Sequence, residues 1–547
     1  MNTAGLLKPD DALAAHHGLT VIEGAAADAI VEGAPGRGPD NRDVLTVTGD
    51  LAAMMRETWT ALTGHNRSNP RLFRTPDCAS IVEVAETETG PTLRRFTEDT
   101  WRAYLVNRIR FMKASKKGVE DALPCRDLVK TTLATPDKGL PVLSRLITVP
   151  VAGPDGAFLT TQGYNVAARA FYQPPAGFRL PPIPEAPTAE DIRNAGDLLW
   201  SPISEFPFTS DAEIAHTIGA MLLPFVRDLI DGPTPLHLIS KPEKGTGASL
   251  LCDVISLIAT GRTAPAGVQP HNDEEARKRI TAALISGSQI VMLDNVKRLE
   301  GASLAAALTS MTWTDRLLGQ SATVQIPVRC LWLATANNPA VSGEIARRVV
   351  RIRLDAKRED PGTRTFEIPD LRGWCHKYHA HLVAAALTLV KAWMRAGRPS
   401  GSATLGSYER WASVIGGILD VAGFPDFLAN RTAFNDEANT EDADAIAFVK
   451  AWLARYGYQT VGVNDLFSMA EDIFDLGSGS DTARRTRLGK TVMRDLCNRI
   501  VCGVRIEDRG TYQGGRRYQL VDVNPAVCAG ERPLGAVNDD MHPYSTN

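Results

Sequence analysis

The chain has 547 residues, which is more than one hydrophobic core organises and predicts about three domains. Its formal net charge of −3 at pH 7 excludes DNA binding through overall basicity, so any DNA-binding surface must be a local cluster of basic side chains. No apolar run reaches the ~18 residues of a membrane span, and the eight cysteines include no C-x-x-C pair, which argues against a membrane segment, a zinc ribbon and a disulfide framework.

The first 190 residues are expected to form a leader and a domain. Residues 1–40 are rich in Ala, Gly, Pro and Asp and have no sustained hydrophobic period, which predicts a flexible leader. They contain no basic stretch followed by an apolar segment, so we expect a cytoplasmic protein. Residues 41–190 predict a mainly helical α+β domain that ends in a Pro-rich connector at 172–187. Its helical patterns cover 47–62 and 98–113, and its strands 80–84 and 144–151.

The middle of the chain alternates apolar strands with helical segments. The strands are expected at 235–240, 289–293, 329–334 and 349–354. Such alternation implies a mostly parallel sheet covered on both faces, which we assign to residues 191–365. Helical patterns at 371–395 and 408–421 predict a helical lid over residues 366–435.

The last third of the chain has a different pattern. Residues 440–523 combine three helices with two strands and a Gly-containing turn, which is typical of a winged-helix domain. The helices are expected at 445–456, 463–474 and 482–499, and the strands at 504–508 and 517–521. Residues 524–547 are expected to form an irregular tail.

A glycine-rich loop follows the strand 235–240. In the P-loop pattern G-x-x-x-x-G-K-[ST], backbone N–H groups wrap the phosphates, the Lys neutralises them and the Ser or Thr hydroxyl ligates Mg²⁺. Here Gly247 and Ser249 match, whereas Pro242 stands at the first glycine and Ala248 replaces the Lys. The alternative is an ordinary Gly-rich turn between a strand and a helix. The residues expected to contact a nucleotide are Lys244, Gly245, Thr246, Gly247, Ala248, Ser249 and Leu250.

Further candidates for the nucleotide site follow two of the next predicted strands. Asp294 follows the strand 289–293 and would hold Mg²⁺ together with Ser249. Asn295 stands where a Glu usually activates the attacking water. Asn337 follows the strand 329–334, in a position suited to sensing the γ-phosphate.

Two arginines complete the series. Arg347 and Arg348 follow Asn337 at a distance from which they could reach the γ-phosphate of a neighbouring subunit, as an arginine finger does. Each feature alone is weak evidence. Their order and spacing favour a P-loop ATPase over an ordinary turn.

Residues 207–356 resemble the AAA+ ATPase core of superfamily 3 type helicases, specifically the primase-helicases of phages, plasmids and integrated elements related to the poxvirus primase-helicase. The resemblance rests on the segments GTGASLL, IVMLDNV, WTDRLLG, ATVQIPVRCLWLATANNP and EIARRVVRIRLDA. It implies an α/β fold with an AAA+ P-loop ATPase core, preceded by a helical domain and followed by a winged helix. It also implies a hexameric ring that translocates on single-stranded or forked DNA, with ATP and Mg²⁺ bound between subunits.

Two departures from the family pattern bear on hydrolysis. Ala248 lacks a charge that stabilises the transition state of phosphoryl transfer, and Asn295 cannot take a proton from water. Lys244 or else Lys241 is a candidate for the missing charge, and Glu274 or Glu275 for the missing carboxylate. The first hypothesis is therefore an ATP-hydrolysing DNA helicase of a mobile element. The alternative is an AAA+ DNA-binding scaffold or origin-binding protein that binds ATP and oligomerises with little or no hydrolysis.

The predicted winged helix carries the main cluster of basic residues. Residues 484–517 include ten basic and three acidic side chains, a net charge of +7. A recognition helix and a wing would place these charges on DNA, and the alternative is a solvated face or a protein-docking domain. The candidates are Arg484, Arg485, Arg487 and Lys490 in the helix, Arg516 and Arg517 in the wing, and Arg316, with Lys297 and Arg298, in the pore of the ring.

Three other patterns are interpreted as structural or negative. The basic run 102–117 with interleaved aromatic residues favours an amphipathic helix whose aromatic side chains lie in the core. His376 and His379 lie one helical turn apart but have no complementary ligands, which favours structural histidines. Residues 42–190 show no paired acidic residues on a strand, so a primase or polymerase would be a separate chain.

Overall fold

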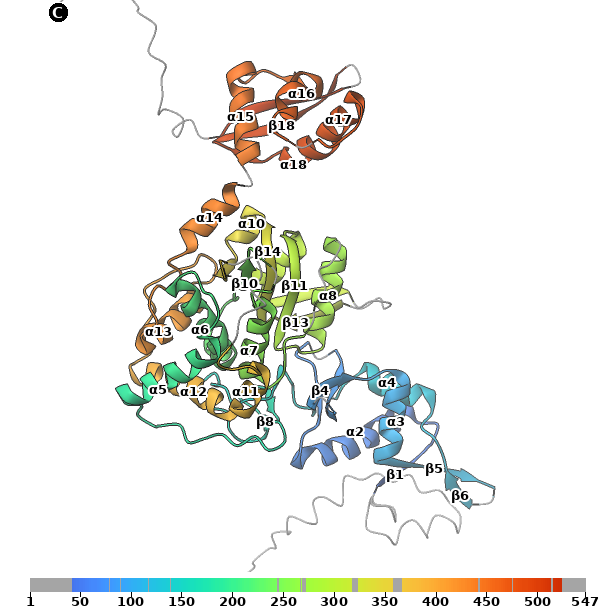
Figure 1. The fold of residues 1–547 in the computed structure, drawn as a ribbon. Helices are drawn as coiled ribbons and strands as arrows, with labels where there is room; N and C mark the ends of the chain where they lie inside the picture. Colours follow the sequence, from blue (N-terminus) through green and yellow to red (C-terminus); the bar gives the residue numbers. More distant parts are fainter. Residues whose placement is uncertain are drawn as a thin grey trace, which may run out of the picture. The chain divides into compact units, whose positions relative to one another are not determined.

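The computed structural model describes residues 42–523 except 78, 89, 117, 138, 244, 266, 268–271, 317–322, 358–365, 441–442, 475 and 513–514. The expected leader, the expected tail and Lys244 lie outside the described residues. The chain is a mixed α/β protein (Figure 1) that divides into two compact units. The first unit comprises residues up to 297, 301–339 and 348–430, and the second 298–300, 340–347 and 431 onward. The expected domain boundary near residue 190 stays a prediction.

The N-terminal part of the first unit contains three small sheets. Their strand orders are β1-β5-β6, β2-β3-β4 and β7-β9-β8. The helices are α2 (Leu51–Ser68), α3 (Glu98–Arg108) and α4 (Arg126–Ala134). The strands are β1 (Asp43–Thr46), β2 (Leu72–Arg74), β3 (Ile81–Thr87), β4 (Gly90–Arg95), β5 (Ile109–Ser115), β6 (Gly118–Asp121), β7 (Arg145–Ile147), β8 (Gly163–Asn165) and β9 (Ala170–Tyr172). The expectation of a mainly helical region is therefore wrong, because several of these strands are too short to show an alternating pattern.

Local caps explain two helix boundaries here. α2 begins four residues later than expected, because Asp50 accepts a hydrogen bond from the backbone N–H of Ala53 at 2.9 Å and caps the helix. α3 begins at a capping box made by Thr97 and Thr100. α3 ends at Arg108, so the expectation that one amphipathic helix carries the basic run is wrong, and the run continues into β5. Trp101 on α3 and Phe111 on β5 lie in the core as expected, whereas Tyr104 is half-buried.

The central sheet has the strand order β11-β14-β10-β15. β10 pairs in parallel with β14 and with β15, as expected for this region. Leu238 and Ile239 on β10 point to opposite faces and both are 0% exposed, so the sheet is covered on both sides. The strands are β10 (Leu236–Lys241), β11 (Ile290–Leu299), β14 (Leu331–Val341) and β15 (Val349–Arg353), and a separate hairpin is formed by β12 (Thr312–Arg316) and β13 (Thr323–Pro327).

Six helices share one hydrophobic cluster with this sheet. They are α5 (Ala189–Trp200), α6 (Asp211–Val226), α7 (Ala248–Thr260), α11 (Leu371–Lys377), α12 (His379–Arg395) and α13 (Glu409–Ala422). The other helices between residues 270 and 350 are α8 (Asp273–Ile285), α9 (Ala302–Thr309) and α10 (Gly343–Ala346), of which α10 belongs to the second unit. The single helix expected at 371–395 is two helices, which meet at Tyr378. The cluster also includes Ile147 and Tyr172, so strands β7 and β9 pack into the same core as the central sheet.

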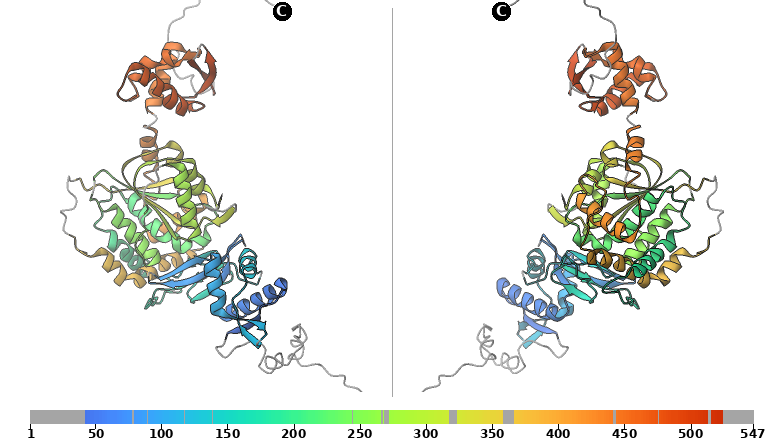
Figure 2. Two further views of the ribbon diagram at one scale, coloured as in Figure 1. Left: turned by 90° about the vertical axis from the view of Figure 1, so that its right-hand side faces the viewer. Right: turned by 90° about the vertical axis from the view of Figure 1, so that its left-hand side faces the viewer.

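The second unit has its own core. Its sheet has the order β16-β19-β18-β17, and Figure 2 shows these strands on one side of the helices. The helix expected at 482–499 is interrupted by a π-helical turn at Leu488–Val492, and the two strands of the hairpin are longer than expected. The elements are α14 (Arg431–Thr440), α15 (Ala443–Tyr456), β16 (Val461–Gly462), α16 (Val463–Glu471), α17 (Asp481–Arg487), α18 (Met493–Leu496), β17 (Ile500–Val501), β18 (Val504–Tyr512) and β19 (Gly515–Asp522). Within the described part of the chain, every helix is too short or too polar to cross a lipid bilayer.

Candidate nucleotide-binding site

The site lies where β10 ends and α7 begins (Figure 1). β14 lies between β10 and β11 in the sheet, so Asn337 on β14 has the glycine-rich loop on one side and the strand of Asp294 on the other. Lys241, the last residue of β10, is the register partner of Asn337. The carboxyl edge of an open α/β sheet is the usual place for a ligand site.

The loop has the backbone that a phosphate site needs. Gly245 and Gly247 have φ values of +79° and +96°, in the left-handed region that other residues adopt only with strain. A Cβ atom at Gly247 would lie 3.0 Å from Cε1 of Phe206, so the loop also packs closely on the segment before α6. Gly247 is the N-cap of α7 and has no side chain to accept a hydrogen bond from the first N–H groups of this helix. Such a helix end attracts phosphate through its N–H groups and its dipole.

Ser249, Asp294 and Thr335 meet at this edge. The Ser249 hydroxyl donates a hydrogen bond to Oδ1 of Asp294 at 3.3 Å, across 45 residues of sequence. The Thr335 hydroxyl donates to the same oxygen and accepts from the backbone N–H of Asn295 at 2.8 Å. The hydroxyl and the carboxylate are hard oxygen ligands of the kind that Mg²⁺ prefers. Sequence reasoning missed Thr335, although it lies two residues before Asn337 and therefore on the same face of its strand.

The two asparagines differ in their surroundings. Asn295 is exposed and has a φ of +53°, a left-handed conformation that Asn tolerates better than most residues. Oδ1 of Asn337 is buried and has no hydrogen-bond partner within the described residues. A buried acceptor without a donor is destabilising, so a donor supplied by a ligand or an ordered water would stabilise this site.

The position of the P-loop lysine is apolar and enclosed. Ala248 is 0% exposed and belongs to the same hydrophobic cluster as Leu251. The two candidates for the missing carboxylate are each paired with a cation one turn along α8. Glu274 contacts Lys278 at 2.8 Å, and Glu275 contacts Arg279 at 3.1 Å.

The candidate arginine finger Arg348 lies away from the loop of its own chain. The carbonyl of Arg348 accepts from the backbone N–H of Leu236 at 3.0 Å, which places Arg348 beside the amino end of β10. The glycine-rich loop is at the other end of that strand. Arg347 is exposed at the C-cap of α10. Arg348 is therefore badly placed to reach a nucleotide on its own loop, and a role in a neighbouring subunit's site remains a prediction.

Three candidate DNA contacts on α17 are engaged inside the second unit. Arg484 forms ion pairs with Glu471 and Asp481. The guanidinium of Arg485 lies 4.4 Å from the ring centroid of Phe467. Arg487 donates to the backbone carbonyl of Leu476 at 2.6 Å and of Ser478 at 3.0 Å. These contacts give the three arginines a structural role, which sequence reasoning did not foresee.

The remaining DNA candidates lie outside α17 and differ in exposure. Lys490 is exposed on the π-helical turn. Arg516 and Arg517 lie on β19, where Arg516 pairs with Asp508 and Arg517 lies over the ring of Tyr512. Tyr512 is 61% exposed. Arg316 is exposed at the end of β12, and Lys297 and Arg298 are exposed near the end of β11.

The two histidines expected on the lid differ in burial. His379 is buried, and burial lowers its pKa to about 4, whereas His376 is exposed. Across the described residues, no group of three or more His, Cys, Asp or Glu side chains is arranged to hold a metal ion.

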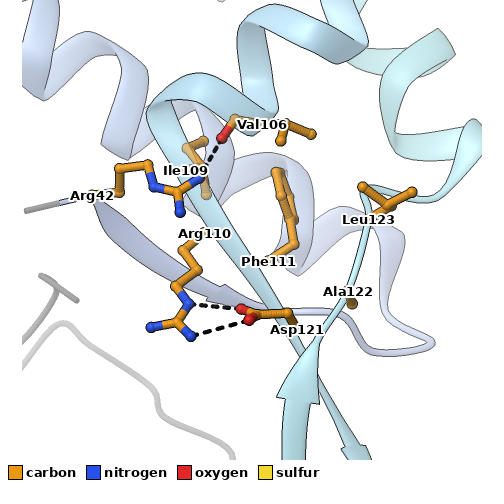
Figure 3. A pocket seen from close by; sticks show the side chains of 8 residues that line it. All are labelled: Arg42, Val106, Ile109, Arg110, Phe111, Asp121, Ala122 and Leu123. Carbon is orange, nitrogen blue, oxygen red and sulfur yellow. Dashed lines mark hydrogen bonds and ion pairs between the residues drawn. The ribbon is translucent and has the colours of Figure 1, made fainter. Parts of the chain in front are cut away.

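A cavity of about 530 Å³ lies in the N-terminal part of the first unit (Figure 3). Arg42 donates there to the carbonyl of Val106 at 2.7 Å, and Arg110 donates twice to Asp121, at 2.7 and 3.2 Å. No residue that lines this cavity belongs to the loop or to the strands of the nucleotide site.

Comparisons with known proteins place no family name on the chain. No family model matches it, and no curated protein matches it. Among solved structures, the chain is similar to two apo structures of the NrS-1 C-terminal region. The first is 10% identical with a TM-score of 0.34, and the match covers 85% of this chain and 98% of that one. The second is 11% identical with a TM-score of 0.35, and the match covers 85% of this chain and 99% of that one. It is also similar to SCCmec type IV Cch, an active helicase, at 11% identity and a TM-score of 0.34, covering 83% of this chain and 92% of that one. At these TM-scores the similarity assigns no activity to the chain.

Proposed function

We propose that the chain is an AAA+ type P-loop ATPase that binds ATP and Mg²⁺ at residues 245–249 and acts on DNA as a helicase or translocase. The observation that carries this proposal is the hydrogen bond from Ser249 to Asp294. It joins the first turn of the loop helix to Asp294 in the middle of β11, at the end of the apolar part of that strand, and P-loop ATPases hold Mg²⁺ from these two places. An ordinary Gly-rich turn gives no reason for this pairing.

The other residues at this edge have consistent roles. The N–H groups of the loop and of the first turn of α7 would bind the phosphates. Ser249 and Asp294 would hold Mg²⁺, which neutralises charge that develops on the phosphates. The unpartnered oxygen of Asn337 would accept a hydrogen bond from a water beside the nucleotide. The residues therefore fit a nucleotide with its metal ion.

The proposal also includes DNA binding by the second unit and assembly of the chain into a ring. A helical group with a long β-hairpin, as seen in the second unit, suits a winged helix, and its hairpin arginines suit contacts to the DNA backbone. Arg348 lies beside the amino end of the loop strand, which suits a ring in which Arg347 or Arg348 enters the site of the next subunit. We place this activity in the replication of a phage, plasmid or integrated element.

One observation favours a second function. Ala248 is enclosed in the core, Asn295 carries no carboxylate, and Glu274 and Glu275 are already paired with cations. A chain with these features would bind ATP and hydrolyse it slowly. It would then be a DNA-binding AAA+ scaffold or origin-binding protein whose oligomer depends on nucleotide.

One set of measurements tests both functions. ATP binding, DNA-stimulated ATP hydrolysis and displacement of a strand from forked DNA are measured for the full chain, for Ser249→Ala and for Asp294→Asn. We expect both variants to bind ATP with Mg²⁺ about tenfold more weakly or worse, because each removes a metal ligand. Lys450→Ala, on the exposed surface of α15, is the control and should bind as the full chain does.

The outcomes separate the two functions. Turnover and strand displacement by the full chain, both lost in Asp294→Asn, support the helicase. ATP binding and oligomerisation without turnover support the scaffold. If the full chain binds no ATP, or if both variants bind it normally, the nucleotide site is wrongly placed.

A further inference from the structure

The loop lacks the positive charge that a P-loop lysine supplies to the phosphates. Ala248 occupies that position and is 0% exposed, so its side chain contributes to packing only. The nearest described lysine along the chain is Lys241, the last residue of β10. It is half-buried, so its stem is partly covered and its charge is only partly solvated.

Strand geometry places Lys241 on the face of the sheet that carries the site. Lys241 is the register partner of Asn337, and Ile239 is the register partner of Thr335. Side chains of register partners point to the same face, and residues two apart on a strand share a face. The Thr335 hydroxyl bonds to Asp294. Lys241, Asn337 and Thr335 therefore lie on the face where the Ser249–Asp294 contact is found.

Electrostatics around α7 give a second, independent indication. Burial raises the pKa of the Cys252 thiol, the negative charges of Asp253 and Asp294 raise it further, and the positive charge of Lys241 opposes them. Lys241 and Asp294 thus both act on a residue one turn along α7 from Ala248. Among the described residues, Lys241 forms no ion pair with a carboxylate.

A half-buried ammonium group that has no carboxylate partner among the described residues is suited to an anionic ligand. The lysine side chain is a flexible four-carbon stem with a compact charge, so it can reach a ligand held by the following loop. The loop glycines and the first turn of α7 provide the other half of such a phosphate site.

We propose that Lys241 replaces the missing P-loop lysine and binds the β- and γ-phosphates of the nucleotide from the strand that precedes the loop. This proposal rests on the proposed ATP site and adds the residue that neutralises the phosphates. The positive charge then comes from the end of β10 instead of the start of α7.

Calorimetric titration with ATP and with ADP, in Mg²⁺, tests the assignment. It compares the full chain with Lys241→Ala, Lys241→Met and Lys241→Arg. We expect Ala and Met to weaken ATP binding about 10- to 100-fold, since a hydrogen bond to a charged group is lost, and Arg to retain most of the affinity. Lys450→Ala should leave binding unchanged, and Lys244→Ala tests the competing lysine within the loop.

Lys241→Met separates charge from packing, because Met keeps an apolar stem of similar length. If Lys241→Met binds ATP within about twofold of the full chain, the charge has no role and the assignment is wrong. The same conclusion follows if only Lys244→Ala loses binding. If the full chain binds no ATP, the proposed function fails, and the lysine assignment fails with it. Melting temperatures without nucleotide should be the same for the Met variant and the full chain.

Discussion

At the scale of single residues, buried histidines connect the stability of the first unit to pH. Nδ1 of His216 lies 2.7 Å from the carbonyl of Arg351, and its Nε2 accepts from the backbone N–H of Leu428 at 3.0 Å. Nδ1 must therefore carry the only proton of a neutral ring. Burial lowers the pKa of His216 to about 4. A second proton on Nε2 would face the N–H group of Leu428.

We predict that the first unit loses stability as the pH falls from about 6.5 to about 4. The unfolded chain binds a proton at His216 near pH 6.5, whereas the folded chain binds it only near pH 4. Lowering the pH through this interval therefore stabilises the unfolded state relative to the folded state. The contribution of neutral His216 to the free energy of unfolding is fully present above about pH 6.5. The contribution is about 3 kcal/mol at most. Urea unfolding of His216→Gln between pH 7 and pH 5 should show a smaller pH slope than the full chain. His381→Gln, at an exposed position, should keep the original slope, and equal slopes in all three proteins would contradict the prediction.

At the scale of elements, the second unit divides its arginines between two tasks. The arginines of α17 make contacts within their own unit, since Arg487 donates hydrogen bonds to two backbone carbonyls of the segment before α17. In the β18–β19 hairpin, Arg516 is exposed and Arg517 is half-buried, and the ion pair of Arg516 contributes little to stability at such an exposed position. The amino-acid composition shows where positive charge is concentrated along the chain. The contacts of each side chain show which arginines have a structural role within the unit.

We predict that DNA binding depends on the hairpin and folding on α17. The double variant Arg516→Ala, Arg517→Ala should bind a single-stranded oligonucleotide about tenfold more weakly, with a smaller salt dependence and little change in stability. Arg487→Ala should instead destabilise the second unit by about 1–2 kcal/mol through the lost hydrogen bonds. Fluorescence anisotropy at two salt concentrations and calorimetric melting measure the two effects. Weaker DNA binding in Arg487→Ala than in the double variant, without a change in melting, would reverse this division.

At the scale of the whole molecule, the central sheet separates the nucleotide loop from the arginine at its opposite edge. Parallel pairing of β10 with β15 places Arg348 at the amino end of the strand whose carboxyl end opens into the loop. An arginine so placed serves a nucleotide only if a second copy of the chain brings it there. The topology thus makes oligomerisation part of the proposed catalysis.

We predict that two inactive variants restore activity to each other. A chain with Asp294→Asn lacks the site but keeps the arginines, and a chain with Arg347→Ala and Arg348→Ala keeps the site but lacks the arginines. Mixed oligomers contain some complete sites, so ATP hydrolysis by the mixture should exceed the sum of the separate activities. Purely additive activity over a range of mixing ratios would show that the arginines act within their own chain or not at all.

Much of the site could be predicted from the sequence because its residues follow strands in a fixed order. Asp294 and Asn337 follow the apolar parts of β11 and β14, and Gly247 and Ser249 follow β10. A sheet in which these strands lie side by side brings the four residues to one edge. Thr335 was missed because a threonine within a strand has no distinctive pattern. The many short strands of the N-terminal part were missed because three-residue strands show no alternation.

The sequence by itself determined where the strands follow one another along the chain, where the loop between β10 and α7 lies, and that Ala248 stands in the position of the P-loop lysine. These features follow from local patterns. The tertiary structure decided which side chains meet. The Ser249–Asp294 contact spans 45 residues, and the register of β10 and β14 places Lys241 beside Asn337. Ion pairs and hydrogen bonds engage Arg484 and Arg487 with other residues of their own unit. Local patterns depend on neighbours along the chain, whereas these contacts depend on strand register and burial, which only the folded chain defines.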